Sequence, residues 1–206
     1  MKLRNRESMV VLGGFLGAVA LSAALVLAVV SQLTSQPIKD AQARGRQAVF
    51  YRLSLPEFDS VEKDEIIDGI KFTPVARDGK ICGFVGQGSG SGYGGAIEVM
   101  VGFSPEGTIT GVQILQHKET PGLGANVCDR KFQRTIFNLN ETAPEVPSNI
   151  YLDQFSGKKA VDAGVWKISK DGGSFNYMTG ATVSCRAVTG TVNRIAQTFS
   201  LWRKDK

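Results

Sequence analysis

A long run without a charged side chain, from Met9 to Val30, is the feature that most constrains this chain. It reads MVVLGGFLGAVALSAALVLAVV. At a rise of about 1.5 Å per residue, a helix of this length crosses a hydrocarbon core of about 30 Å. A cleaved signal peptide has an apolar region about half as long and a small-residue cleavage site, which VVSQLTS at the end of the run does not provide. We therefore expect a transmembrane helix over residues 9–32.

The charges around this segment predict its orientation. Lys2, Arg4 and Arg6 come directly before it, whereas the other side carries no charge until Lys39. Cytoplasmic flanks are enriched in Lys and Arg, so residues 1–8 should lie in the cytoplasm. Everything from residue 33 to residue 206 should then be periplasmic or extracellular, in an inner-membrane protein with one span. Small residues recur along the span and permit close helix approach, so we expect it to pack against other membrane helices.

The remainder of the chain has the pattern of one α+β domain. Pro37–Arg52 contains helix-forming residues and predicts a stalk helix. Later segments predict a helix over Cys128–Asn138, a strand over Val165–Ser169 and a terminal helix over Ala187–Trp202. Because strands and helices do not alternate regularly, we expect an antiparallel sheet flanked by helices, with the last two early strands joined as a hairpin by Ser-Pro-Glu-Gly. The early strands are Ile70–Val75, Ile81–Val85, Ala96–Phe103 and Thr108–Leu115.

Composition argues against several classes of function. The formal net charge is +5, but the basic residues are scattered, which disfavours nucleic-acid binding. Cys82, Cys128 and Cys185 lie far apart without CxxC spacing or a histidine cluster, so we predict no metal or haem site. We expect each cysteine to serve as a small buried hydrophobic side chain. Whether two of them form a disulfide stays open. A hydrolase is disfavoured because the chain lacks a G-x-S-x-G motif.

The glycine-rich stretch Gly86–Gly95 superficially resembles a dinucleotide-binding loop. Such a loop opens a helix, whereas the residues that follow here, AIEVMV, are typical of a strand. Two interpretations remain. The stretch is either a flexible surface loop or a segment whose missing side chains let the backbone approach a planar ligand.

The segment before the terminal helix carries the strongest chemical signal. It ends in small and hydroxyl-bearing residues, Thr179-Gly-Ala-Thr182-Val-Ser184. A helix start offers free backbone N–H groups to an anion such as phosphate. The three hydroxyl residues could equally cap the helix, which is the commoner role of such residues.

This hydroxyl segment resembles the [S/T]-G-A-T-x-[S/T] flavinylation motif of the FMN-binding domain family. Three further segments in the same order, Gly92–Val101, His117–Gly124 and Lys170–Gly173, are similar to the G subunits of Rnf ion-translocating electron-transport complexes. The resemblance covers nearly the whole chain. It implies FMN in phosphoester linkage to Thr182, made from FAD by a flavin transferase.

Within this resemblance, the loop that follows His117 would lie against the flavin. Leu123 would cover the isoalloxazine, the turn at Pro121–Gly122 would shape the loop, and Glu119 and Thr120 would make polar contacts. Electron transfer through a flavin needs no protein acid or base, so we assign His117 no catalytic role. The implied cofactor-binding residues are Thr182, Thr179, Gly180, Ala181, Ser184, Glu119, Thr120, Gly122, Leu123, Tyr93 and Gly94.

The resemblance implies an electron carrier in a complex that couples ferredoxin and NAD redox chemistry to pumping of Na⁺ or H⁺. Its partners would be the other membrane subunits and the flavin transferase, and it would have no turnover alone. Asn176 stands where the transferase recognition pattern usually has an acidic residue, and it keeps one acceptor oxygen. The C subunit of the Na⁺-translocating NADH:quinone reductase, which is typically longer, is the nearest alternative. A membrane-anchored scaffold protein is the alternative from another class. The pumped ion, the flavin potential and the order of donor and acceptor stay open.

Overall fold

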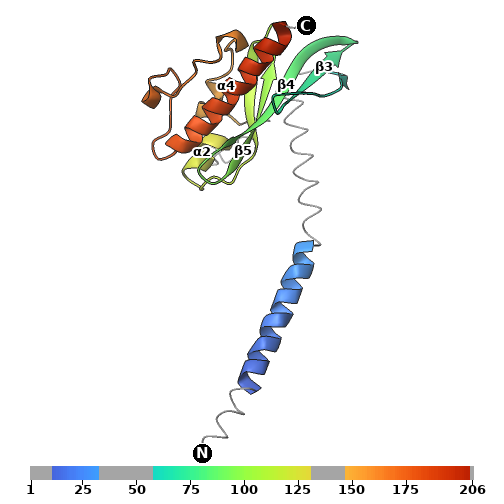
Figure 1. Ribbon diagram of the computed structural model, residues 1–206, viewed down its shortest axis with the longest axis vertical. Coiled ribbons are helices and arrows are strands. Elements are labelled where there is room, and N and C mark those ends of the chain that lie inside the picture. Colours follow the sequence, from blue (N-terminus) through green and yellow to red (C-terminus); the bar gives the residue numbers. More distant parts are fainter. Residues whose placement is uncertain (1–10, 33–57, 131–146, 205–206) are drawn as a thin grey trace, which may run out of the picture. The chain divides into compact units, whose positions relative to one another are not determined.

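The computed structural model describes residues 11–32, 58–130 and 147–204. Its contacts divide the chain into two units, Met1–Gln47 and Ala48–Lys206. The described part of the first unit is one helix, Val11–Gln32, with a mean hydropathy of 2.3 and no buried residue (Figure 1). Its length and composition suffice to cross a membrane, so the predicted apolar helix is confirmed. The expected stalk helix lies outside the described residues.

The described residues of the second unit contain a six-stranded antiparallel sheet in the order β1-β3-β4-β5-β6, with β2 also paired to β3 (Figure 1). Two of its hairpins turn at Asp-Gly pairs, Asp68-Gly69 and Asp78-Gly79. The φ angles are 49° and 73° in the first pair and 51° and 74° in the second. Positive φ at both central residues gives the type of turn that matches the twist of paired strands. The strands are β1 Ser60–Val61, β2 Glu65–Ile67, β3 Ile70–Arg77, β4 Lys80–Ser91, β5 Ala96–Phe103 and β6 Ile109–Gln116.

Helix α4, Thr182–Lys204, packs against β4 and β5 and supplies much of the core (Figure 1). Its buried positions recur at helical spacing and meet the large apolar side chains of the sheet. The predicted α+β class, with an antiparallel sheet flanked by helices, is confirmed. The other helical elements are short: α2 Gly124–Cys128, α3 Ile150–Asp153, and the 3₁₀ turns η1 Ala160–Asp162 and η2 Ser169–Asp171.

The glycine-rich stretch is mostly strand. It continues β4 as far as Ser91, so the prediction of a flexible surface loop is wrong for these residues. A Cβ at Gly86 would lie 2.5 Å from Ile195 Cγ2, and one at Gly90 would strike Thr191 Oγ1. At Gly86 and Gly90 the missing side chains therefore let the backbone approach helix α4.

Two other predicted elements differ from the structure. Residues 165–169 do not form a strand, because only Ile168 bridges to Phe175 before the 3₁₀ turn begins at Ser169. The alternating burial of Trp166 and Ile168 produced a strand-like pattern without a neighbouring strand. A short helix ends at Cys128, where the sequence predicted a helix to begin, and the stretch after residue 130 lies outside the described residues.

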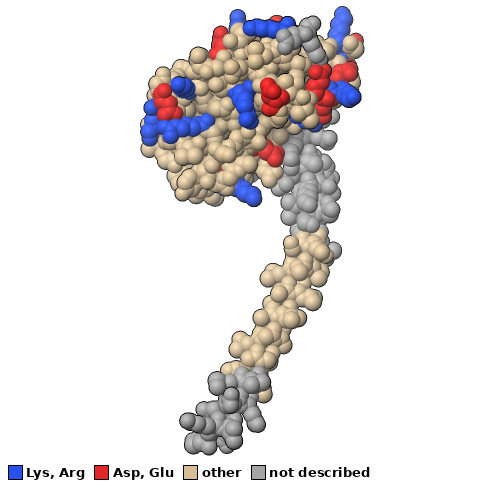
Figure 2. Space-filling model, in the orientation of Figure 1, with Lys and Arg blue, Asp and Glu red and all other residues tan. Residues whose placement is uncertain are grey.

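The predicted hairpin is confirmed, with β5 at the expected bounds and β6 at Ile109–Gln116. The three cysteines are free, with Cys128 and Cys185 buried and Cys82 half-buried. Burial raises the pKa of the Cys128 thiol to about 12, so that group stays protonated at neutral pH. On the face in Figure 2, basic and acidic side chains are interspersed over the second unit.

Candidate functional site

Three of the predicted site segments meet at the carboxylate of Glu119, whose residue is only 6% exposed. The N–H of Gly94, in the turn after β4, donates to Glu119 Oε1 at 2.9 Å. Ser184, in the first turn of α4, donates its hydroxyl to Oε2 at 2.5 Å. Hydrogen bonds to a charged acceptor are stronger than neutral ones. Glu119 therefore ties the turn, the loop and the helix start together.

The glycines around this carboxylate are required by the lack of space. A Cβ at Gly92 or at Gly124 would strike a carboxylate oxygen of Glu119. A Cβ at Gly94 would strike the carbonyl of Lys118. Close backbone approach therefore explains why glycine recurs in the two segments predicted from the resemblance.

His117 fixes the start of the loop. Its Nδ1 accepts a hydrogen bond from the Glu119 N–H at 3.1 Å, and its Nε2 lies 2.8 Å from Asp129 Oδ1. Because Nδ1 accepts, this network assigns the proton to Nε2, which donates to the carboxylate. The ring thus links the loop to the residue that follows α2.

The exposed tip of the loop lies next to the hydroxyl segment. The N–H of Leu123 donates to the Thr120 carbonyl at 3.2 Å, and Gly122 takes a positive φ of 79°. Leu123 is 49% exposed. Its Cδ2 lies 3.1 Å from where a Cβ at Gly180 would be. Leu123 and Gly180 therefore form adjacent parts of one apolar surface beside the start of α4.

Within the described ranges, no side chain caps the start of helix α4. Its first helical bond runs from Cys185 N–H to the carbonyl of Ala181 at 2.9 Å. Ala181 has no polar side chain, and the N–H groups of residues 182–184 have no acceptor among the described residues. Free N–H groups and the helix dipole together favour an anion at this position.

The three hydroxyl residues do not cap this helix. Ser184 is committed to Glu119, and Thr179 is exposed. Thr182 is half-buried, and its hydroxyl has no hydrogen-bond partner among the described residues. The capping interpretation is therefore wrong for the structure described here, and Thr182 Oγ1 remains available for chemistry beside the free N–H groups.

The comparison with known proteins identifies the family. Residues 92–197 match the FMN-binding domain family. The chain is 31% identical to the G subunit of the ion-translocating oxidoreductase complex of Cereibacter sphaeroides, over 97% of this chain and 88% of that one. It is also 31% identical to the corresponding G subunit of Pseudomonas aeruginosa, over 99% and 94% of the two chains. The chain belongs to this G-subunit family with its FMN-binding domain. The predicted resemblance is thereby confirmed.

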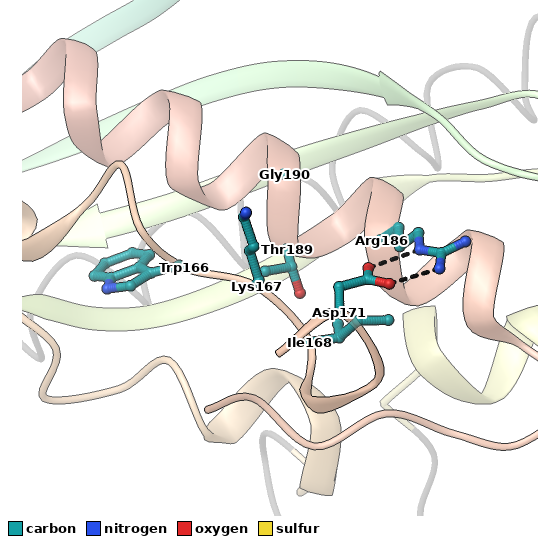
Figure 3. A pocket seen from close by; sticks show the side chains of 7 residues that line it. All are labelled: Trp166, Lys167, Ile168, Asp171, Arg186, Thr189 and Gly190. Atoms are coloured by element: carbon teal, nitrogen blue, oxygen red, sulfur yellow. Dashed lines mark hydrogen bonds and ion pairs between the residues drawn. The ribbon is translucent and has the colours of Figure 1, made fainter. Parts of the chain in front are cut away.

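The match to the FMN-binding domain family spans every site segment described above. In this G-subunit homologue the fourth predicted segment, Lys170–Gly173, also contacts α4. Arg186 of the helix donates two hydrogen bonds, of 2.7 and 2.6 Å, to the Asp171 carboxylate (Figure 3). The guanidinium lowers the pKa of the Asp171 carboxyl, and the carboxylate raises the pKa of Arg186. Lys170 places its ammonium 5.8 Å from the centre of the Tyr177 ring.

The sequence patterns did not reveal two residues around α4 in this G-subunit homologue. They indicated no role for Arg186, although a position four residues after Thr182 lies on the same helix face. They also did not indicate Tyr151, whose buried hydroxyl lies 2.8 Å from the Cys185 carbonyl oxygen and 2.6 Å from Thr189 Oγ1. The single tyrosine on short helix α3 gave no sequence signal for this long-range contact. The predicted Tyr93 is 76% exposed, next to the turn at Gly94.

Proposed function

We propose that this G-subunit homologue is an electron carrier that holds FMN in phosphoester linkage to Thr182, within an Rnf-type ferredoxin:NAD oxidoreductase complex. The observation that carries the proposal is the open start of α4. There the unpartnered Thr182 hydroxyl lies beside N–H groups that have no acceptor among the described residues. A covalently bound phosphate needs a hydroxyl that can carry it and N–H donors that stabilise its negative charge.

The chain's own residues would hold the phosphate and limit its movement. Thr182 Oγ1 would take the FMN phosphoryl group from FAD, with AMP as the leaving group and the hydroxyl proton lost to solvent or the transferase. The N–H groups of residues 182–184 and the positive end of the helix dipole would stabilise the negative phosphodiester. Small residues at Gly180 and Ala181 leave access to the hydroxyl.

The neighbouring loop would orient the ring. FMN supplies the electron-transfer chemistry, and the protein supplies position and environment. Leu123 offers an exposed apolar surface against Gly180, and Glu119 holds the loop to α4 through Ser184. Since both Glu119 carboxylate oxygens already accept hydrogen bonds from the protein, its role is to position the loop. Thr120 and Tyr93 are exposed and would supply further contacts.

The apolar helix would anchor the carrier in the inner membrane, with its N-terminus in the cytoplasm and the FMN-binding domain outside. No pool of free FMN is expected there, so a site filled only by mass action would lose its cofactor. A phosphoester prevents that loss. The other membrane subunits and a flavin transferase would be the partners.

Of the two alternatives, only the scaffold protein predicts the absence of flavin. The C subunit of the Na⁺-translocating NADH:quinone reductase would also be flavinylated, but the G subunits of Cereibacter sphaeroides and Pseudomonas aeruginosa align over nearly the full chain. A scaffold protein without flavin would be colourless. The absence of hydroxyl capping among the described residues removes the reason to assign the Thr179–Ser184 segment a purely structural role.

In-gel fluorescence after denaturing electrophoresis tests the proposal. The full chain is expressed with a flavin transferase as wild type, Thr182→Ala and Ser200→Ala, a hydroxyl deletion near the other end of α4. We expect a fluorescent band for wild type and for the Ser200 control, and a dark band for Thr182→Ala. A dark wild-type band or a bright Thr182→Ala band would overturn the proposal.

A further inference from the structure

A groove of about 380 Å³ lies along α4 and is formed on its other side by the segment from Trp166 to Asp171 (Figure 3). Trp166, which is 8% exposed, contributes an apolar edge, whereas Ile168 is only 1% exposed; Arg186 and Lys167 contribute N–H donors. The volume falls within the range of about 300–1,000 Å³ that is usual for small-molecule sites. Such sites combine mostly apolar lining with a few polar groups, as this groove does.

The groove and the Glu119 loop lie on different sides of α4. Successive residues of a helix are separated by about 100° around its axis, so Ser184, which bonds Glu119, lies about 200° from Thr182. Arg186 lies only about 40° from Thr182 and about one turn further along. Thr182 therefore lies on the same face of α4 as the groove. Because it stands at the start of the helix, an FMN attached to it would also reach the Glu119 loop.

We propose that this groove is a second resting position for the isoalloxazine ring of the FMN attached to Thr182. The inference rests on the proposed function, and it adds a site to the loop position around Leu123. The tethered ring would exchange between the two flanks of α4. Each position would present it in a different direction, as a carrier between two redox partners requires.

The chemistry of the groove suits this occupant. An isoalloxazine has an apolar dimethylbenzene end and a pyrimidine end rich in hydrogen-bond acceptors. The exposed edge of Trp166 matches the first, and the N–H donors of Lys167 and Arg186 match the second. These two cations face a single lining carboxylate, Asp171, so the groove also accommodates the negative charge of a reduced, anionic flavin.

Because the ring would be attached to Thr182, a shallow groove is sufficient to hold it. The five-carbon ribityl chain is longer than one helical turn of about 5.4 Å, and the groove begins about one turn from Thr182. A short flexible linker gives a tethered group an effective concentration on the order of millimolar. A groove too weak to retain free flavin would therefore be occupied for a substantial fraction of the time by the attached ring.

Gly190 provides a way to close the groove without touching the attachment point. It lines the groove, and a Cβ built on it meets no atom within 4 Å. In Gly190→Leu the new side chain would extend into the groove, whereas Gly190→Ala makes the same type of change without filling it. Trp166→Phe keeps an aromatic ring against Phe175 but removes the indole. An indole in contact with a flavin quenches its fluorescence strongly.

The test is the time-resolved flavin fluorescence of the detergent-solubilised full chain, co-expressed with a flavin transferase. We expect a short-lifetime component in wild type and in Gly190→Ala. Its amplitude should fall at least twofold in Gly190→Leu and in Trp166→Phe. An unchanged amplitude in both variants, or no short component in wild type, would overturn the second position.

Denaturing gels of the same samples separate the two proposals. If all the bands fluoresce while the lifetimes do not differ, the covalent carrier stands and the groove inference fails. If every band is dark, the proposed function fails, and the groove inference fails with it. If Gly190→Leu does not fold, Trp166→Phe decides the outcome against wild type.

Discussion

Helix α4 is held by different means at its two ends. The aromatic half, Ile195–Lys204, packs into the sheet, where Phe199 stacks on Phe103 with ring centres 4.2 Å apart and planes within 2°. Trp202 stacks on Phe72 with ring centres 5.3 Å apart. The other end, Thr182–Arg186, is called the attachment end because the proposed FMN linkage lies there; it is held by polar contacts at Glu119 and Asp171 and contains the half-buried Thr182.

This difference shows how one helix can be both scaffold and site. Burial of aromatic side chains contributes most of the stabilisation, so the helix does not depend on a cap at its start. The first N–H groups can then stay available for a ligand. The account predicts that changes in the aromatic half lower stability, whereas changes at the attachment end chiefly alter the flavin.

The largest loss of stability should come from Phe199→Ala. This side chain is 1% exposed and contacts rings from three strands, so its removal leaves a cavity. We expect a loss of about 3–5 kcal/mol in the free energy of unfolding. Denaturant unfolding of the detergent-solubilised chain measures it. Leu201→Ala, at a position 55% exposed on the same helix, is the control and should change stability by less than about 0.5 kcal/mol. Equal losses would contradict the comparison.

A smaller loss is expected when one methyl group is added between sheet and helix. In Gly86→Ala the Cβ would lie 2.5 Å from Ile195 Cγ2 and 3.0 Å from Phe72 Cε1, so side chains must shift. We expect a loss of about 1–3 kcal/mol. The same substitution at Gly190, where no atom lies within 4 Å, should instead stabilise α4 by about 0.5–1 kcal/mol. Melting curves that move in the same direction for both variants would contradict the close-approach explanation.

At the attachment end, Glu119→Ala should chiefly alter the flavin. It leaves the Ser184 hydroxyl and the Gly94 N–H without their acceptor, at a cost of about 1–3 kcal/mol. Without these two hydrogen bonds the loop that bears Leu123 should move more freely. The flavin fluorescence lifetime should then lengthen, or the flavin anisotropy should change. Glu119→Gln keeps one acceptor and one donor and should restore most of both properties. If the alanine variant keeps the wild-type flavin anisotropy, the loop does not contact the ring.

The smallest effect should be the pH dependence of the exposed pair Asp171–Arg186. Arg186 lowers the pKa of the Asp171 carboxyl below its ordinary value of 3.8. The pair therefore contributes its full stabilisation above that value and loses it as the pH falls through the lowered folded-state pKa. As the pH is lowered from 4, wild type should lose slightly more stability than Arg186→Gln. Parallel melting temperatures over this range would show that the pair contributes nothing.

Local sequence patterns predicted much of the fold but not its contacts. The hairpin from Ala96 was predictable because alternating apolar residues flank a turn sequence. The role of Gly86 and Gly90 was not, because the helix that needs their space lies about a hundred residues away in the chain. The helix start at Thr182 was placed too late, at Ala187, for a local reason: the small and hydroxyl residues there have weak helix propensity of their own.

The candidate site was predicted as a set of motifs rather than as an arrangement. The four segments named from the resemblance do gather around the start of α4, through Glu119 and through Arg186. Their motifs did not reveal that Glu119 faces inward to join two segments. They also gave no sign of the groove beside Trp166, because it exists only where the 3₁₀ turn packs along the helix.

The most direct test of the covalent carrier is peptide mapping of the purified full chain after co-expression with a flavin transferase. Trypsin cleaves after Lys170 and Arg186 and releases residues 171–186, which contain both threonines of the motif. The account predicts that this peptide carries the mass of one FMN less one water and that fragmentation places it on Thr182. An unmodified peptide, or FMN located on Thr179 or on any other residue, would contradict the account.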